Sequence, residues 1–170
     1  MHKLNIPKLF KKPLLFSLAL MLLIGVLTGC TPNPENFSTT KITITLDESF
    51  KKYDLEGYDL SVKSDDVVFT AKEETFHNLE RSGYELNSLA DYADEILSLN
   101  GTKGDKLAQR DNYYYFTTTK TDKGAKYTYV HCMYEDKEAY WVCIFYCKSK
   151  DYNRLSDDIF KWADSVEITN

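Results

Sequence analysis

The chain has 170 residues, of which 43% are apolar and 14% aromatic, and its 26 acidic side chains outnumber the 21 basic ones. The formal net charge of −5 argues against a nucleic-acid partner and against electrostatic docking on anionic lipid, because both require basic patches. The length suits one folded domain with a single core.

The first 29 residues have the charge and hydropathy pattern of an export signal. Four lysines and no acidic residue precede an apolar run over residues 14–27, which has the length of a signal-peptide core and is short for a membrane span. The run closes on Leu27-Thr28-Gly29-Cys30. This closing stretch resembles the lipobox of bacterial lipoprotein precursors. The alternative interpretation is an ordinary secretory signal with Cys30 just after its cleavage site.

The lipoprotein resemblance implies cleavage between Gly29 and Cys30 and a location at the cell membrane, on its extracytoplasmic face. Cys30 would carry two or three fatty acyl chains, such as palmitate, and two chains anchor a protein stably where one does not. Cleavage removes four lysines and no acid, which changes the formal net charge from −5 to −9. We therefore expect the covalent lipid, not surface charge, to hold the protein to the membrane.

The residue pattern after the lipobox changes from a polar, proline-containing segment to predicted strands and then to predicted helices. Residues 31–40 contain two prolines and small polar residues, so we expect residues 30–40 to comprise the lipidated cysteine and a flexible tether. Alternating apolar residues then predict three strands, at 41–46, 58–63 and 67–72. Helical periodicity follows at 73–81 and again after Ser88, a candidate N-cap for a helix that reaches residue 99.

The second half returns to strands and closes on a helix. Strands are predicted at 113–119, 126–134 and 139–148, the first two joined by a hairpin turn at Thr121-Asp122-Lys123-Gly124. Helical spacing covers 151–164, and a short strand follows. We therefore predict that residues 41–170 form a single α+β domain, an antiparallel β-sheet meander with helices packed on one face.

The order of these elements resembles the PsbP-like fold, the family of the extrinsic photosystem protein PsbP and of bacterial lipoproteins that share its architecture. The resemblance rests on the opening Ile42-Thr43-Ile44, on the closing strand Trp141-Val142-Cys143-Ile144-Phe145-Tyr146, and on a terminal helix that leads into Ser165-Val166. It implies an architecture only. No functional residue is carried over, because a shared fold does not assign a function.

Three cysteines follow the lipobox. With a four-residue hairpin loop, Cys132 faces Cys143 across the strand pair, and a disulfide between them is feasible with Cys147 left free. With a two-residue loop Cys132 faces Trp141 instead, and this disulfide is excluded. The alternative is that all three are buried thiols that behave as small apolar side chains.

The sequence contains no phosphate-binding glycine loop, nucleophile elbow, zinc-protease motif or EF-hand series. Glu73, His77 and Glu80 share one predicted helical face and are a candidate metal site. Solvated Glu and His side chains are common on short helices, however, and no further ligand is identifiable. We therefore expect no cofactor, no metal and no catalytic residues.

Tyrosines dominate the predicted strands. We hypothesise that Tyr113, Tyr115, Tyr127 and Tyr129 form an aromatic stripe on the sheet face away from the helices, which would suit a partner protein or a glycan at the cell surface. The alternative is that these side chains are core residues and cross-strand pairs.

These observations predict a membrane-anchored extracytoplasmic lipoprotein whose domain is a non-catalytic binding or interaction module. The competing hypothesis is a small-ligand receptor or an enzyme with a pocket between the helices and the sheet. A flat exposed tyrosine surface favours the first hypothesis, and a pocket lined by converging polar groups favours the second.

Overall fold

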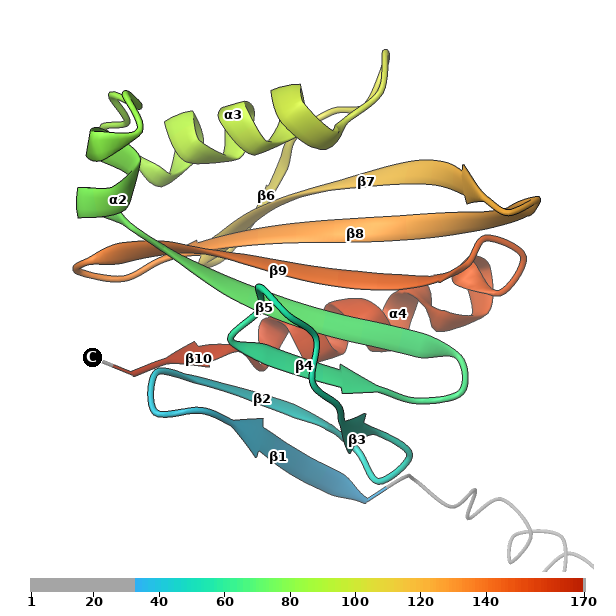
Figure 1. Ribbon diagram of the computed structural model, residues 1–170. Coiled ribbons are helices and arrows are strands. Elements are labelled where there is room, and N and C mark those ends of the chain that lie inside the picture. The colour runs from blue at the N-terminus through green and yellow to red at the C-terminus, as the bar shows by residue number, and fades with distance from the viewer. Residues whose placement is uncertain (1–32, 170) are drawn as a thin grey trace, which may run out of the picture. The chain divides into compact units, whose positions relative to one another are not determined.

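The computed structural model describes residues 33–169, so the predicted signal peptide, the lipobox and Cys30 lie outside the described residues (Figure 1). Within residues 33–169, no helix is both long and apolar enough to cross a membrane. The elements of this part of the chain are β1 (Pro34–Ser38), β2 (Ile42–Asp47), β3 (Lys51–Lys52), β4 (Leu60–Lys63), β5 (Val67–Thr75), α2 (Phe76–Arg81), α3 (Leu89–Asn100), β6 (Ala108–Arg110), β7 (Tyr113–Asp122), β8 (Ala125–Glu135), β9 (Ala139–Lys148), α4 (Tyr152–Asp164) and β10 (Glu167–Ile168).

The strands form two sheets. A small sheet has the order β1-β2-β10, and a large sheet has the order β3-β4-β5-β9-β8-β7-β6. Every neighbouring pair in both sheets is antiparallel. The predicted α+β class with an antiparallel sheet is therefore confirmed. Strands β6 to β9 form a meander, and β5 joins the sheet beside β9, so the intervening α2 and α3 connect the two halves of the large sheet (Figure 1).

The helices lie on opposite faces of the large sheet, whereas we expected them on one face (Figure 1). Helix α4 and strand β2 pack on the face that we call the α4 face, and α3 packs on the other, the α3 face. The reason lies in the central strands. Strand β9 is apolar or aromatic at both alternating sets of positions, so both of its faces require cover, and one layer of helices covers only one face.

Each face has its own core cluster. On the α4 face the hydroxyl of Tyr134 donates a hydrogen bond to the carbonyl oxygen of Ala163 at 2.8 Å, which ties β8 to the last turn of α4. The α4 side chains buried there are Leu155, Ile159 and Ala163. On the α3 face the buried helical residues are Tyr92, Ala93 and Ile96. The predicted cap of α3 is confirmed, because the hydroxyl oxygen of Ser88 accepts a hydrogen bond from the backbone N–H of Asp91 at 3.2 Å.

Residues 34–38, which we expected to belong to the tether, form strand β1 instead. This strand pairs with β2 along its whole length, and Phe37 contributes a buried side chain to the core while its neighbours on β1 stay exposed. The prediction was wrong because it took the two prolines as evidence against a strand. Pro34 lies at the first position of an edge strand, where a missing N–H costs no ladder hydrogen bond.

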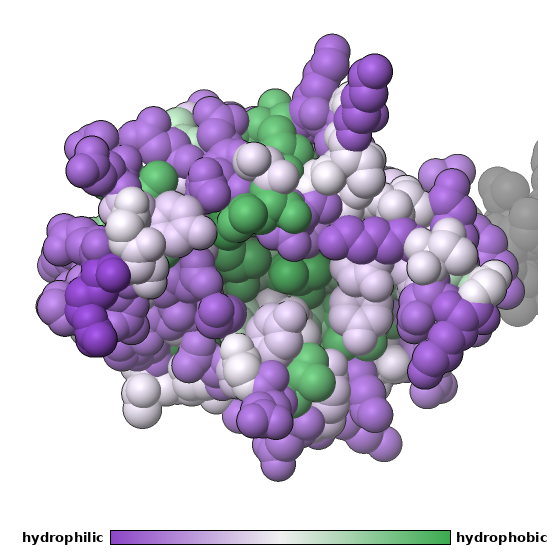
Figure 2. All heavy atoms as spheres, turned by 45° about the horizontal axis from the view of Figure 1, so that its top comes forward, coloured by the Kyte–Doolittle hydropathy of each residue, from purple (hydrophilic) through white to green (hydrophobic). Residues whose placement is uncertain are grey.

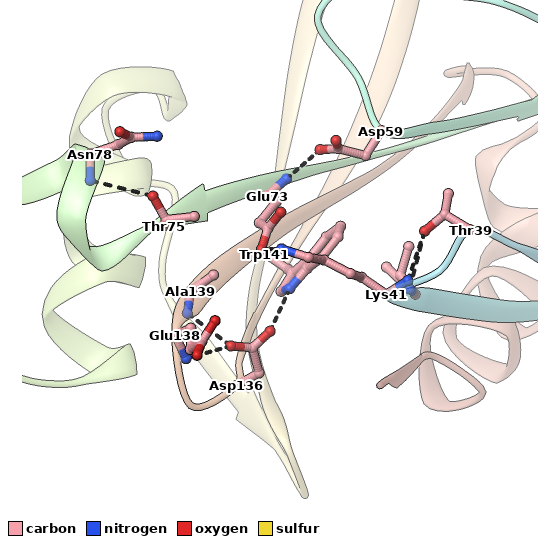
Figure 3. A network of polar contacts seen from close by, with 11 residues as sticks. Thr39, Lys41, Asp59, Glu73, Thr75, Asn78, Asp136, Glu138, Ala139 and Trp141 are labelled. Atoms are coloured by element: carbon pink, nitrogen blue, oxygen red, sulfur yellow. Dashed lines mark hydrogen bonds and ion pairs between the residues drawn. The ribbon is translucent and has the colours of Figure 1, made fainter. Parts of the chain in front are cut away.

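The hairpin between β8 and β9 is fixed by Asp136 (Figure 3). One carboxylate oxygen of Asp136 accepts hydrogen bonds from the backbone N–H groups of Glu138 (2.7 Å) and Ala139 (2.8 Å), and the other accepts one from the indole N–H of Trp141 (3.0 Å). These bonds hold the loop that leads from β8 into β9. They therefore select the register in which Glu135 faces Tyr140 and Cys132 faces Cys143.

Candidate functional site

Helix α3 is too short to cover the face on which it lies. Its 12 residues span about 18 Å at 1.5 Å per residue, whereas the 11 residues of β8 span about 36 Å at 3.3 Å per residue. The cluster under α3 includes Phe116, Met133, Tyr140 and Val142, which occupy one half of the central strands. The other half of the α3 face extends beyond the end of the helix.

This uncovered half contains a hollow of about 480 Å³, which we call the tyrosine hollow. Figure 2 shows apolar side chains exposed in a hollowed area near the middle of this side of the molecule. The residues that give the hollow its character are Tyr58, Tyr127, Tyr129, His131, Ile144 and Tyr146. Its volume and its mixture of aromatic and polar groups are those of sites that bind small ligands.

The tyrosines hold one another in place. Tyr129 and Tyr146 face each other across β8 and β9, with stacked rings whose centroids are 5.2 Å apart. Tyr127 meets Tyr146 edge-on at 6.5 Å, and the ammonium group of Lys120 lies 5.9 Å from the centre of the Tyr129 ring. Cross-strand pairs of this kind restrict the rotamers of the rings, so the hollow is largely preformed.

His131 lies at the floor of the hollow and is only 3% exposed. Its ring stacks on Phe116 with centroids 4.4 Å apart and planes within 7°. Among residues 33–169 neither ring nitrogen has a hydrogen-bond partner. The pKa of His131 is lowered to about 4, chiefly by burial and to a smaller extent by the positive charge of Lys120, while Asp105 opposes the shift. The imidazole is therefore neutral at physiological pH.

The structure separates the four tyrosines that we hypothesised to form one stripe. Tyr113 and Tyr115 lie on the α4 face, where Tyr113 is buried and the Tyr115 ring contacts Phe160 of α4. Tyr127 and Tyr129 lie on the α3 face and line the hollow. The cause is the two-residue turn at Lys123-Gly124, which pairs Asp122 with Ala125.

Because of that turn, odd-numbered residues of β7 face even-numbered residues of β8, as in the pair of Tyr115 with Cys132. Lys123 and Gly124 both have positive φ, 46° and 82°, the combination that this type of hairpin turn requires.

A second concavity, a groove of about 430 Å³, runs between α2, α3 and the end of β5. It corresponds to the predicted pocket between helices and sheet, and Asn100 lines both the groove and the hollow. Its polar groups are paired with one another. The hydroxyl of Tyr92 donates to the Glu74 carboxylate at 2.8 Å, and the ammonium of Lys72 lies 2.8 Å from the same group. The Glu74 carboxylate raises the pKa of both Lys72 and Tyr92, and burial is the larger cause for Tyr92.

The cysteines occupy the α4 face. Cys132 and Cys143 lie directly opposite each other, which is the register that makes the hypothesised disulfide feasible, and both are free thiols in the structure. Burial raises the pKa of each of these thiols well above its ordinary value. Cys147 is also buried and free, and its pKa is raised to about 11. The thiols are therefore protonated and unreactive at physiological pH.

The residues of the candidate metal face do not share one helix. Glu73 lies in β5 and its carboxylate pairs with the Lys41 ammonium (Figure 3). His77, in contrast, is an exposed residue of the short helix α2. Across residues 33–169, no group of three or more His, Cys, Asp or Glu side chains is arranged to hold a metal ion.

Sequence reasoning missed His131, Tyr146 and Tyr58 as members of the site. The signal for the first two was present, because the register in which Cys132 faces Cys143 also places Tyr146 opposite Tyr129 on the same face as His131. Tyr58 comes from the irregular segment between β3 and β4, and no periodicity places such a segment over a sheet.

These features define an antiparallel α+β domain with a concave aromatic site on one sheet face. No protein-family model matches the chain, and no curated protein matches its sequence. Solved structures do share its fold.

A protein of Bacteroides thetaiotaomicron matches with a TM-score of 0.53 and 12% identity over 76% of this chain. The match covers 45% of that protein, so the chain spans less than half of its length. The Ran-binding protein Mog1p of Saccharomyces cerevisiae matches with a TM-score of 0.54 and 7% identity, over 81% of this chain and 96% of Mog1p. The cyanobacterial PsbP of Synechocystis matches with a TM-score of 0.48 and 10% identity, over 84% of this chain and 95% of that protein. At these identities the similarities to the Bacteroides protein and to Mog1p show the fold alone.

Proposed function

We propose that the protein is a lipoprotein anchored through Cys30 at the extracytoplasmic face of the cell membrane, and that its folded domain is a non-catalytic binding module. The anchor is supported by the export-signal pattern and by Leu27-Thr28-Gly29-Cys30. Only three residues separate Cys30 from the first residue of β1. A fully extended chain of that length spans about 11 Å, so the lipid would keep the domain close to the membrane surface.

The observation that carries the binding function is the tyrosine hollow with His131 at its floor. Both ring nitrogens of His131 are buried, so the surface that the hollow offers to a ligand consists mainly of the tyrosine side chains and the polar groups around them. The ring contacts of Tyr129 and Tyr146 keep the site open in the absence of a ligand. A rigid aromatic surface supplies contact area with little loss of side-chain entropy, which suits binding.

The groove beside α3 is the basis for the competing function, a receptor or an enzyme that uses the pocket between helices and sheet. Glu74 is its best candidate for acid–base chemistry, and its carboxylate is held by Tyr92 and Lys72. Both oxygens of the Glu74 carboxylate are already bonded within the protein, one to Lys72 and the other to Tyr92. We therefore prefer the tyrosine hollow to the groove as the functional site.

Replacing Cys30 by alanine tests the anchor. Cells that express the wild-type chain and are fed a palmitate analogue should yield a labelled protein in the membrane fraction. The C30A variant should carry no label and should be left uncleaved or released, because the thiol that receives the lipid is gone. Thr31→Ala, which leaves the lipobox intact, is the matched control and should behave as wild type. A labelled C30A variant would show that the lipobox interpretation is wrong.

A further inference from the structure

The groove beside α3 has no free acid–base pair, but it leaves apolar side chains in contact with water. Its lining includes four aliphatic residues, Leu79, Leu86, Ile96 and Leu99. Leu99 is 62% exposed, more than any other large apolar side chain of residues 33–169. Apolar surface in a concavity is stabilised when a partner covers it, so the groove has the character of a docking surface.

The segment that builds the groove is strongly acidic. Residues 73–100, which comprise the end of β5, α2 and α3, contain seven acidic side chains and one basic side chain, Arg81. Two of the three acidic residues that line the groove, Glu73 and Glu74, are paired with lysines. The third, Glu95, forms no ion pair within residues 33–169. The potential at the groove is therefore negative, which favours a cationic partner.

The unpaired carboxylate and the exposed leucine share one face of α3. Glu95 and Leu99 are four residues apart in this helix, and both line the groove. A partner that matches both has a cationic group beside a bulky apolar group. A peptide segment with lysine or arginine next to leucine or phenylalanine has this arrangement, whereas a polyamine has the cations without the apolar group.

The groove and the first strand lie at opposite ends of the domain. Figure 1 shows α2 and α3 above the large sheet and β1 below it. With Cys30 as the anchor, only three residues before β1, the groove lies at the end of the domain that is farther from the membrane. It is then open to a protein that approaches from the aqueous side. This orientation rests on the proposed anchor, whereas the charge and the apolar surface of the groove do not.

We propose that the groove beside α3 docks a segment of a partner protein in which lysine or arginine flanks a bulky apolar residue. The apolar side chain is buried in the groove against Leu99, and the cation pairs with the Glu95 carboxylate. Burial of the apolar group supplies free energy that salt does not screen, and the charges select the partner and speed its approach. This surface shares only Asn100 with the tyrosine hollow, so its occupancy does not depend on a ligand in the hollow.

Fluorescence anisotropy with the mature lipidated protein in nonionic detergent micelles tests the docking surface. The probe is a fluorescein-labelled peptide of sequence Lys-Leu-Lys-Lys-Leu-Lys, and its binding to empty micelles is subtracted. One comparison peptide has glutamate in place of lysine, and the other has serine in place of leucine. The lysine–leucine peptide should bind, and each comparison peptide should bind at least about tenfold more weakly.

Three variants locate the binding. Glu95→Lys should weaken the affinity for the lysine–leucine peptide at least about tenfold, because it replaces an attraction by a repulsion. Leu99→Ser should weaken it about fivefold through lost apolar contact, and the core stays intact because Leu99 is exposed. Asp157→Lys makes the same change in net charge on the exposed surface of α4, and it should leave the affinity within about twofold of wild type.

Several results would overturn the docking surface. One is a lysine–leucine peptide that does not bind. Equal binding of the serine-containing peptide, or no effect of Leu99→Ser, would show that the apolar wall of the groove is not used. Equal losses of affinity in Glu95→Lys and Asp157→Lys would show that the peptide responds to net charge and not to the groove.

Discussion

Acidification from pH 6.5 to pH 4 is expected to destabilise the folded domain by about 3 kcal/mol through His131 alone. The ordinary pKa of histidine is 6.5, and burial against Phe116 lowers the pKa of His131 to about 4. Between pH 6.5 and pH 4 the imidazole of residue 131 is therefore protonated in the unfolded chain and neutral in the folded chain. The free energy of unfolding falls as the pH drops through 6.5, and this contribution levels off below pH 4.

The His131→Phe variant isolates this contribution. Urea unfolding of both proteins at a series of pH values gives the free energy of unfolding, and the value for the wild type minus the value for the variant should fall by about 3 kcal/mol toward pH 4. Carboxylates elsewhere titrate in the same range, but they are common to both proteins and cancel in the difference. Lys120 and Asp105, the charged groups near His131, are also common to both. Parallel curves would show that His131 is not a buried neutral imidazole.

Replacing Ile159 by alanine is expected to cost about 3–4 kcal/mol of stability. Ile159 is fully buried on α4, and it belongs to the core cluster that joins this helix to the α4 face of the large sheet. Its truncation leaves a cavity that the surrounding β-sheet cannot close, because the strands are held on both sides by their neighbours.

The matched control for Ile159→Ala is Asp158→Ala, an exposed position one residue earlier on the same helix, which should change stability by less than about 0.5 kcal/mol. Denaturant midpoints measured at constant slope give both values. A loss below about 1 kcal/mol for Ile159→Ala would mean that α4 does not cover the core on this face.

Local patterns predicted most of the strands and helices. Alternation located β2, β4 and β5, helical spacing located α3 and α4, and the hairpin turn at Lys123-Gly124 is where the sequence places it. These elements could be predicted because the spacing of apolar residues along a strand or helix reflects which of its own faces is buried. Placement on a particular face is a tertiary property. Both alternating sets of residues in β9 are apolar, which indicated that both faces of the sheet are buried. No local pattern indicated that α3 packs on one face and α4 on the other.

The candidate site was predicted only in part, because the register of the strands determines which residues come together in it. Tyr127 and Tyr129 belong to the hollow, whereas Tyr113 and Tyr115 lie on the opposite face. The two-residue turn at Lys123-Gly124 causes this separation, since it pairs odd-numbered residues of β7 with even-numbered residues of β8. The predicted turn over residues 121–124 did not specify that register. The burial of His131 comes from its stacking on Phe116 and from segments distant in sequence that line the hollow, which a residue pattern does not reveal.

The most direct test of the binding hollow is site-specific photo-cross-linking on intact cells. A benzophenone amino acid is placed at position 127, inside the hollow, and in a separate variant at position 126, an exposed neighbour on the same strand whose side chain points to the other face. After irradiation, the chain modified at position 127 should shift to a higher mass, and the chain modified at position 126 should not. Cross-links of equal yield at both positions, or none at position 127, would contradict the assignment of the tyrosine hollow as the binding site.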